Sequence, residues 1–175
     1  MSEIIMQKIT LEDVSLLSEI AKKTFYDTFT GTCTENDMQL FLDQYYNENI
    51  LAEELKNAAF KYYFAVENEK IIGYVLYSES NVEFDEINGS NALELKRFYI
   101  SKEYHGKGAA HKMMDFLIDY ANAQGYDNLF LGVWEFNYRA QNFYKKFDFK
   151  LTAHRHDFPI GNTAQTDVYM WKSLN

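Results

Sequence analysis

Two glycines between an expected strand and an expected helix are the clearest sign of chemistry in this chain. Gly106 and Gly108 lie in the run 104–110, after residues 92–100, whose pattern predicts a strand, and before residues 109–124, whose pattern predicts a helix. Backbone N–H groups in such a loop converge with the positive end of the helix dipole, and glycine lets the backbone approach an anion without a Cβ in the way. The run therefore predicts a site for phosphate or pyrophosphate. The alternative is an ordinary strand-to-helix turn that uses glycine for its geometry.

Two familiar nucleotide-binding motifs do not fit this loop. A nucleoside triphosphate P-loop has Ser or Thr directly after its lysine, whereas Lys107 is followed by Gly108. A dinucleotide fingerprint needs a small residue where His111 stands, and it follows the first strand of its domain. This loop comes after at least two expected strands. The anion is therefore expected to belong to another class of ligand.

Length and composition predict a single folded domain. The chain has 175 residues, of which 47% are hydrophobic and 17% aromatic, with Pro159 as its single proline, so long disordered stretches are not expected. Cys33 is the one cysteine and cannot form an internal disulfide, which fits a reducing compartment. Residues 1–10 do not resemble a secretory signal, and no apolar run approaches the roughly 18 residues of a membrane span. We expect a cytoplasmic protein with no membrane partner.

The net charge of −9 bears on the class of partner. Nucleic-acid binding needs a basic surface, and the densest basic patch, residues 154–156, is short, so no nucleic-acid partner is expected. A negative surface raises the local concentration of cationic small molecules. The alternative is that the acidic charge only keeps the protein soluble.

Hydrophobic periodicity and capping residues predict the helices and strands that position the glycine loop. Thr34 and Asn137 are expected to cap helices, and Asn68-Glu69 is expected to form a tight hairpin turn. Helices are expected over 11–24, after 34, over 50–57, over 109–124 and after 137, and strands over 4–9, 62–67, 70–78, 92–100, 129–134, 149–155 and 168–171. This order predicts a mixed α/β or α+β sheet protein in one domain.

The order of elements and two motifs resemble the GCN5-related N-acetyltransferase (GNAT) superfamily. The first motif is 105–110, His-Gly-Lys-Gly-Ala-Ala, and the second is 137–149, Asn-Tyr-Arg-Ala-Gln-Asn-Phe-Tyr followed by Lys-Lys-Phe-Asp-Phe. His105 departs from the Gln or Arg of the family, and Asp148 stands where glycine is usual, near a helix end where Asp tolerates a positive φ. The resemblance covers nearly the whole chain. It implies one N-acetyltransferase domain over 1–175, with a mixed, mostly antiparallel sheet whose central strands splay and are flanked by helices.

Two further stretches resemble one branch of that superfamily, the PaiA-like polyamine N-acetyltransferases. They are 24–29, Thr-Phe-Tyr-Asp-Thr-Phe, and 93–100, Leu-Glu-Leu-Lys-Arg-Phe-Tyr-Ile. The resemblance implies a small-molecule amine as substrate, with a polyamine such as spermidine or spermine as the first expectation. An amino acid, an aminoglycoside, a protein N-terminus or a non-catalytic CoA-binding sensor are the alternatives. Aromatic residues in 25–29, expected to be exposed, leave room for a homodimer.

The resemblance also implies acetyl-CoA as the acetyl-donor cosubstrate, which supplies a pyrophosphate for the glycine loop. Its amide arm is expected to pair like an extra strand beside residues 92–100. Asn137 is expected to contact the cofactor in addition to capping its helix. The cofactor-binding residues expected on this basis are Phe98, Tyr99, Ile100, His105, Gly106, Lys107, Gly108, Ala109, Ala110 and Asn137.

Two side chains are expected to be catalytic. Tyr144 matches the family tyrosine that protonates the departing sulfur; its helical spacing with Phe143 and Phe147 alone favours a core residue, and the motif context favours the catalytic role. An alkylammonium with a pKa near 10.4 costs roughly 4–5 kcal/mol to deprotonate at pH 7, which argues for a carboxylate base. Glu94 is the first candidate for that base, and a surface carboxylate is the alternative. By family analogy the backbone N–H of Phe98 stabilises the oxyanion, and no metal site is expected.

Overall fold

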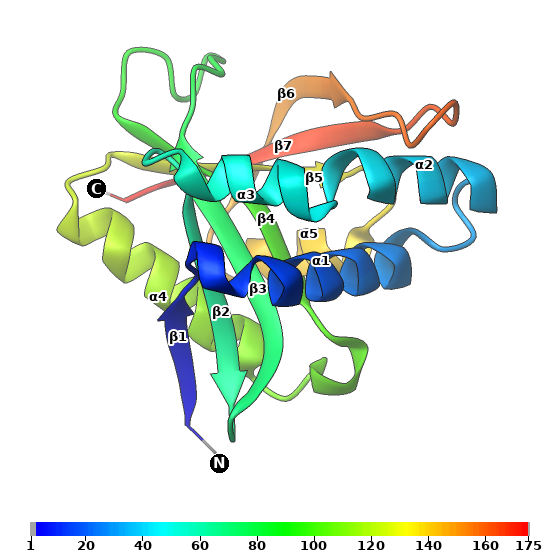
Figure 1. Ribbon diagram of the computed structural model, residues 1–175. Coiled ribbons are helices and arrows are strands. Elements are labelled where there is room, and N and C mark those ends of the chain that lie inside the picture. Colours follow the sequence, from blue (N-terminus) through cyan, green and yellow to red (C-terminus); the bar gives the residue numbers. More distant parts are fainter. Residues whose placement is uncertain (1–2, 175) are drawn as a thin grey trace.

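A seven-stranded sheet runs through the protein, in the order β1-β2-β3-β4-β5-β7-β6 (Figure 1). The computed structural model describes residues 3–174. The strands are β1 (Ile4–Lys8), β2 (Lys61–Glu67), β3 (Lys70–Glu79), β4 (Ala92–Ile100), β5 (Asn128–Trp134), β6 (Lys150–Asp157) and β7 (Thr166–Ser173). Only β4 and β5 pair in parallel, and the other neighbours are antiparallel. The expected mixed, mostly antiparallel sheet is confirmed.

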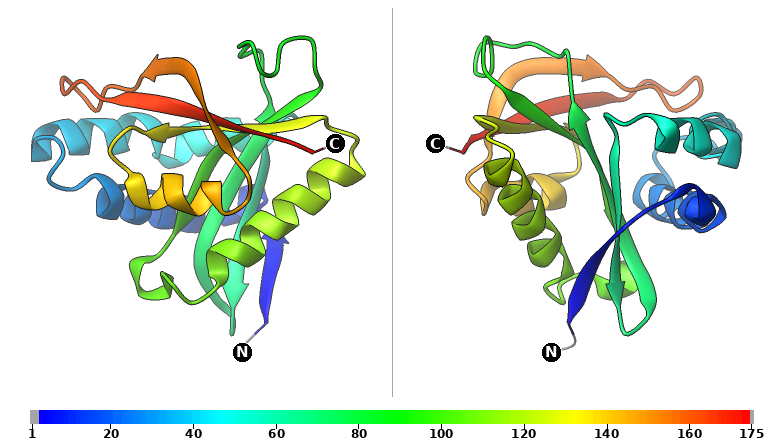
Figure 2. Two further views of the ribbon diagram at one scale, coloured as in Figure 1. Left: turned by 180° about the vertical axis from the view of Figure 1, so that it is seen from behind. Right: turned by 60° about the vertical axis from the view of Figure 1, so that its left-hand side comes forward.

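Helices cover both faces of the sheet, as Figure 2 shows. One face carries α1, α2 and α3, and the opposite face carries α4 and α5. The helices are α1 (Val14–Phe29), which continues a 3₁₀ turn over Leu11–Asp13, α2 (Glu35–Tyr45), α3 (Glu48–Lys56), α4 (Ala109–Ala123) and α5 (Tyr138–Lys145). None of the helices between residues 3 and 174 is long and apolar enough to cross a membrane.

Each face of the sheet buries its own hydrophobic core. Met113 and Leu117 of α4 pack with Leu131 of β5 in one core, and Phe25 of α1 packs with Tyr74 of β3 in the other. All five side chains are at most 1% exposed, so these cores hold the helices firmly against the strands. Residues projecting from the two helical layers are thereby fixed relative to the central strands.

The aromatic residues at the end of α1 are buried rather than exposed. The helix runs to Phe29 instead of ending near residue 24, and Phe25 and Phe29, one turn apart, stack with ring centroids 4.5 Å apart. Phe25 is 0% and Phe29 5% exposed. The expectation that Phe25 and Phe29 are exposed was therefore wrong, because the extended helix turns both rings into the core, and the homodimer itself stays a prediction.

Several local signals in the sequence are confirmed. Asn68 and Glu69 both have positive φ, at 48° and 64°, as the tight turn of a two-residue hairpin requires. Asp148 has φ 65°, the left-handed conformation expected at that helix end. Thr34 Oγ1 accepts a hydrogen bond from the Asp37 backbone N–H at 3.1 Å, so the expected cap of α2 is present.

The central strands β4 and β5 separate partway along their length. Their parallel pairing runs from Ala92 opposite Asn128 to Leu95 opposite Leu131 and stops there. Beyond that point β4 pairs only with β3, and β5 pairs with β7. The expected splay is confirmed, and it leaves one backbone edge of residues 96–100 without a strand partner among residues 3–174.

Candidate active site

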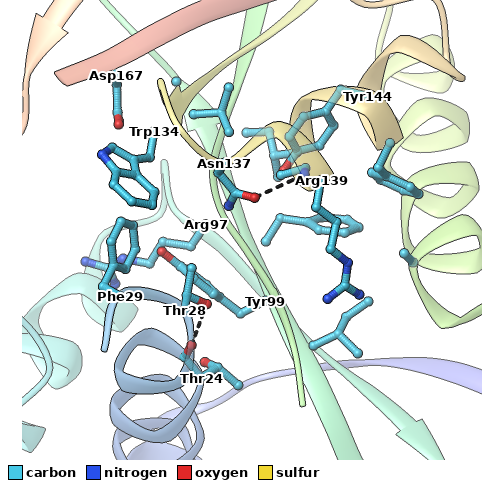
Figure 3. Close-up of a pocket in the computed structure, with 18 of the residues that line it drawn as sticks. Thr24, Thr28, Phe29, Arg97, Tyr99, Trp134, Asn137, Arg139, Tyr144 and Asp167 are labelled. Atoms are coloured by element: carbon cyan, nitrogen blue, oxygen red, sulfur yellow. Dashed lines mark hydrogen bonds between the residues drawn. The ribbon is translucent and has the colours of Figure 1, made fainter. Parts of the chain in front are cut away.

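A cavity of about 1520 Å³ opens where β4 and β5 separate. Its lining comes from α1, α2, β4, the glycine loop, the start of α4, β5, α5, the facing ends of β6 and β7, and the segment that joins them. Figure 3 shows Asp167, Trp134 and Phe29 on one side of it, Tyr144 and Arg139 on the other, and Asn137 between them. The cavity is larger than a typical single-ligand pocket of roughly 300–1,000 Å³, so it has room for two substrates.

The glycine loop forms one end of this cavity. Gly106 and Gly108 have φ of +76° and +88°, which residues with a side chain rarely adopt, and Gly108 is the N-cap of α4. No atom lies within 4 Å of a Cβ built at either position, so the backbone conformation, not crowding, requires glycine there. The loop brings backbone N–H groups to the start of a helix of 15 residues, as an anion site needs.

His105 is held in one orientation beside this loop. Its Nδ1 lies 2.7 Å from Arg139 Nη1, and its Nε2 lies 2.8 Å from the Ile100 carbonyl oxygen. Because arginine only donates, Nδ1 accepts and Nε2–H donates to the carbonyl, which makes the imidazole neutral. Burial lowers the pKa of His105, and the charge of Arg139 lowers it further. Arg139 therefore supplies a positive charge at the loop that sequence reasoning missed, because α5 lies far away in the sequence.

Most residues expected to bind the cofactor line the cavity. Lys107 and Ala109 do not: the Lys107 ammonium lies 5.4 Å over the Tyr104 ring, and Ala109 is 2% exposed in the core beneath the loop. The lining residues are Phe98, Tyr99, Ile100, His105, Gly106, Gly108, Ala110 and Asn137. Asn137 Oδ1 also accepts a hydrogen bond from the Ala140 N–H at 3.1 Å, which confirms its capping role.

The shape of this half of the cavity fits acetyl-CoA. The backbone edge of residues 96–100 that β5 leaves free can exchange hydrogen bonds with an amide chain, because backbone donors and acceptors need partners. The same groove leads to the loop of Gly106 and Gly108. In acetyl-CoA an extended amide arm is followed by a pyrophosphate, which is the order in which the free strand edge and the glycine loop lie along the groove.

Tyr144 is both a packed residue and a cavity residue. Its ring is 7% exposed and contacts the rings of Phe98, Phe143 and Phe149. It lines the cavity, and no residue among 3–174 forms a hydrogen bond with its hydroxyl. Burial raises the pKa of Tyr144, so the hydroxyl keeps its proton at neutral pH. The group is therefore free to donate a hydrogen bond or a proton to a ligand.

Glu94 lies outside the cavity lining. Its side chain is buried, and Oε2 accepts a 2.7 Å hydrogen bond from the Lys96 ammonium. A bulge in the β3–β4 pairing explains the placement: Leu95 pairs with Tyr77, but the next pair is Arg97 with Leu76. The extra residue reverses the alternation of side chains, so Glu94 does not share a face with Phe98.

Asp167 of β7 is an acidic group of the cavity that sequence reasoning missed. It pairs with Trp134 of β5, and both side chains line the cavity. Burial raises the pKa of Asp167 to about 7. Within residues 3–174 no hydrogen bond or ion pair reaches its carboxylate. Gly132, a glycine inside a strand, is a signal in the sequence for a close approach at this point. Only the register of β5 against β7 shows that the group beside Gly132 is Asp167.

Aromatic rings surround the acidic end of the cavity. Phe29 lies 5.6 Å from Trp134 and 5.8 Å from Phe158, measured between ring centroids. The guanidinium of Arg97 also lines this end, but it forms a bidentate ion pair with Glu54, at 2.8 and 3.1 Å. Its charge is therefore balanced from within the fold. Aromatic faces and an unpaired carboxylate together favour a cation.

Comparisons with known proteins agree with this architecture. The acetyltransferase (GNAT) family profile matches residues 19–149. An uncharacterized N-acetyltransferase of Lactobacillus delbrueckii subsp. lactis is 28% identical over 167 residues, 95% of each chain. The spermine/spermidine N(1)-acetyltransferase of Bacillus subtilis is 32% identical over 84 residues, 47% of this chain and 55% of that protein. The PaiA N-acetyltransferase of Thermoplasma acidophilum, solved in complex with coenzyme A, has the same fold: TM-score 0.77, 22% identity, covering 98% of this chain and 99% of that one.

Proposed function

We propose that this chain, which belongs to the acetyltransferase (GNAT) family and is an acetyl-CoA-dependent N-acetyltransferase, acetylates a polyamine such as spermidine or spermine. The observation that carries the proposal is the acceptor end of the cavity, where an unpaired carboxylate lies among aromatic rings. A polyamine offers such a site a primary ammonium, further positive charges and no anionic group. The net charge of −9 favours the approach of such a cation.

The partial likeness to the spermine/spermidine acetyltransferase supports the same substrate class. An amino acid is a weaker candidate, because its carboxylate would have to enter beside Asp167. The alternative of a CoA-binding sensor does not explain why a tyrosine hydroxyl without a protein partner faces the cavity.

Acetyl-CoA, when bound, supplies the acetyl group as a thioester with an electrophilic carbonyl carbon and a sulfur leaving group. The loop of Gly106 and Gly108, with Arg139 beside it, holds the pyrophosphate, and the free edge of β4 holds the amide arm. The Phe98 backbone N–H donates a hydrogen bond to the carbonyl oxygen as negative charge develops there. Tyr144 donates its hydroxyl proton to the departing sulfur, and its raised pKa keeps that proton available.

The test is CoA release from acetyl-CoA with purified protein and a panel of amines: spermidine, spermine, lysine, an aminoglycoside and a short peptide. The proposal expects the two polyamines to give the highest kcat/KM. Samples without amine measure background hydrolysis. A preference of tenfold or more for lysine, the aminoglycoside or the peptide would contradict the polyamine assignment.

A further inference from the structure

We infer that Asp167 binds the reacting ammonium of the acceptor and takes its proton, an inference that rests on the proposed function for the identity of that amine. Four features of the site support it: the space that Gly132 leaves, the missing partner of the carboxylate, its aromatic surroundings, and the pairing of the cations nearby.

Gly132 keeps room for the carboxylate. A Cβ at this position would lie 3.2 Å from Asp167 Oδ2 and 3.6 Å from Asp167 Cβ. Gly132 lies two residues before Trp134 on β5, so a side chain there would project on the same face. The missing side chain opens the sheet surface beside the carboxylate, where a small group such as an ammonium can reach it.

The half-buried carboxylate also lacks the partner that an acid removed from water normally has. Buried charges in proteins are paired or hydrogen-bonded, yet no side chain in the described range donates to Asp167. The nearby Trp134 Nε1–H is buried without a hydrogen-bond acceptor in that range. The Trp134 N–H therefore does not satisfy the Asp167 carboxylate, and an unpartnered carboxylate on a cavity wall indicates that a ligand completes its contacts.

The cations beside the acidic end of the cavity are already paired, whereas Arg139, on the side opposite Asp167 (Figure 3), contacts only the neutral His105. Arg97 binds Glu54, Lys96 binds Glu94, and Lys102 lies 3.4 Å from Asp27. Phe29 and Trp134 line the same side of the cavity as Asp167 and offer aromatic faces to a positive charge (Figure 3). A cationic partner for Asp167 must therefore come from the substrate.

The titratable side chains around Asp167 do not compete with it as proton acceptors. Tyr99 of β4 and Tyr169 of β7 face it, and burial raises the pKa of both, so they are neutral. His156 of β6 is opposite Asp167 in the sheet and is exposed, and Arg97 is paired. Among the described residues beside Asp167, His156 is therefore the side chain that a pH experiment must separate from it.

One proton moves from the ammonium of the acceptor to the carboxylate of Asp167. One N–H bond of the ammonium breaks, an O–H bond forms at the Asp167 carboxylate, and the electron pair stays on nitrogen, which becomes a neutral nucleophile. The raised pKa, about 7 against 3.8, makes this carboxylate a stronger base than an exposed aspartate by about three pKa units, roughly a thousandfold in proton affinity.

The experiment compares wild type with Asp167→Asn, using Asp119→Asn on the exposed face of α4 as a control with the same charge change. The measured quantity is kcat/KM for spermidine between pH 5.5 and 10. Wild type is expected to lose activity below an apparent pKa near 7, and His156→Asn is expected to keep this limb. Asp167→Asn is expected to fall at least 100-fold at pH 8 and to recover tenfold per pH unit toward pH 10, as free amine becomes abundant.

A binding measurement decides the inference without turnover. By calorimetry in the presence of CoA, Asp167→Asn is expected to bind spermidine at least tenfold more weakly than wild type, with acetyl-CoA affinity unchanged within twofold. Unchanged spermidine affinity, or an Asp167→Asn pH profile parallel to wild type, would overturn the role of Asp167. If wild type acetylates a different amine from the panel, the polyamine proposal fails, and both arms are repeated with that amine to judge Asp167 separately.

Discussion

Asp167 should make this protein less stable as the pH rises, and Asp167→Asn should remove that effect. Burial raises the pKa of the folded-state carboxyl to about 7 from 3.8, so between these values the folded state binds more protons than the unfolded state. Stability from this group is therefore complete below pH 4 and is lost as the pH rises through 7. At about 1.4 kcal/mol per pKa unit, the full shift corresponds to at most about 4 kcal/mol above pH 7. The neutral amide avoids this cost.

The assay is urea denaturation of wild type, Asp167→Asn and Asp119→Asn at pH 5, 6, 7 and 8. The free energy of unfolding of Asp167→Asn should exceed that of wild type increasingly from pH 5 to pH 8, reaching roughly 2–4 kcal/mol, or about 4–16 °C in Tm for a chain of this size. Asp119→Asn should follow wild type at every pH. A stability difference that does not change with pH, or an Asp167→Asn protein less stable than wild type at pH 8, would refute the reasoning.

Three further substitutions test other parts of the site and fold. Tyr144→Phe keeps the ring contacts but removes the proton donor, so kcat should fall about 10²- to 10⁴-fold while calorimetry gives an unchanged acetyl-CoA affinity; surviving turnover would exclude the acid role. Gly108→Ala strains a residue at φ +88°, so acetyl-CoA should bind about tenfold more weakly; Gly125→Ala, at φ +76° outside the cavity, should cost a similar ~1–2 kcal/mol of stability but leave that affinity intact. Asp148→Gly relieves a positive φ of 65° and should stabilise the protein by up to about 1 kcal/mol in urea denaturation, and a loss of stability would argue against strain there.

Local signals in the sequence were enough to predict most of the fold. The Asn68-Glu69 turn, the cap at Thr34 and the glycine loop before α4 each depend on a few adjacent residues, whose preferences neighbouring elements do not change. The splay of β4 and β5 came from the family resemblance, and the pairing of the strands confirms it.

The acidic end of the cavity could not be predicted in the same way. Strict alternation along β4 places Glu94 on the face of Phe98, but the bulge after Leu95 reverses that alternation, and a bulge leaves no clear signal in a single sequence. Asp167 meets Trp134 because β7 inserts between β5 and β6, a long-range pairing that no local pattern encodes. The position of Asp167 is therefore set by the register between distant strands, whereas the glycine loop could be predicted from adjacent residues.

The most direct measurement of the central claim is a competition between spermidine and lysine at equal concentrations, with one limiting pool of acetyl-CoA and products identified by mass spectrometry. An acceptor end built from aromatic rings and an unpaired carboxylate predicts that acetylated spermidine exceeds acetyllysine at least 100-fold. Comparable yields of the two products, or an excess of acetyllysine, would contradict the account of this cavity as a site for a polycation.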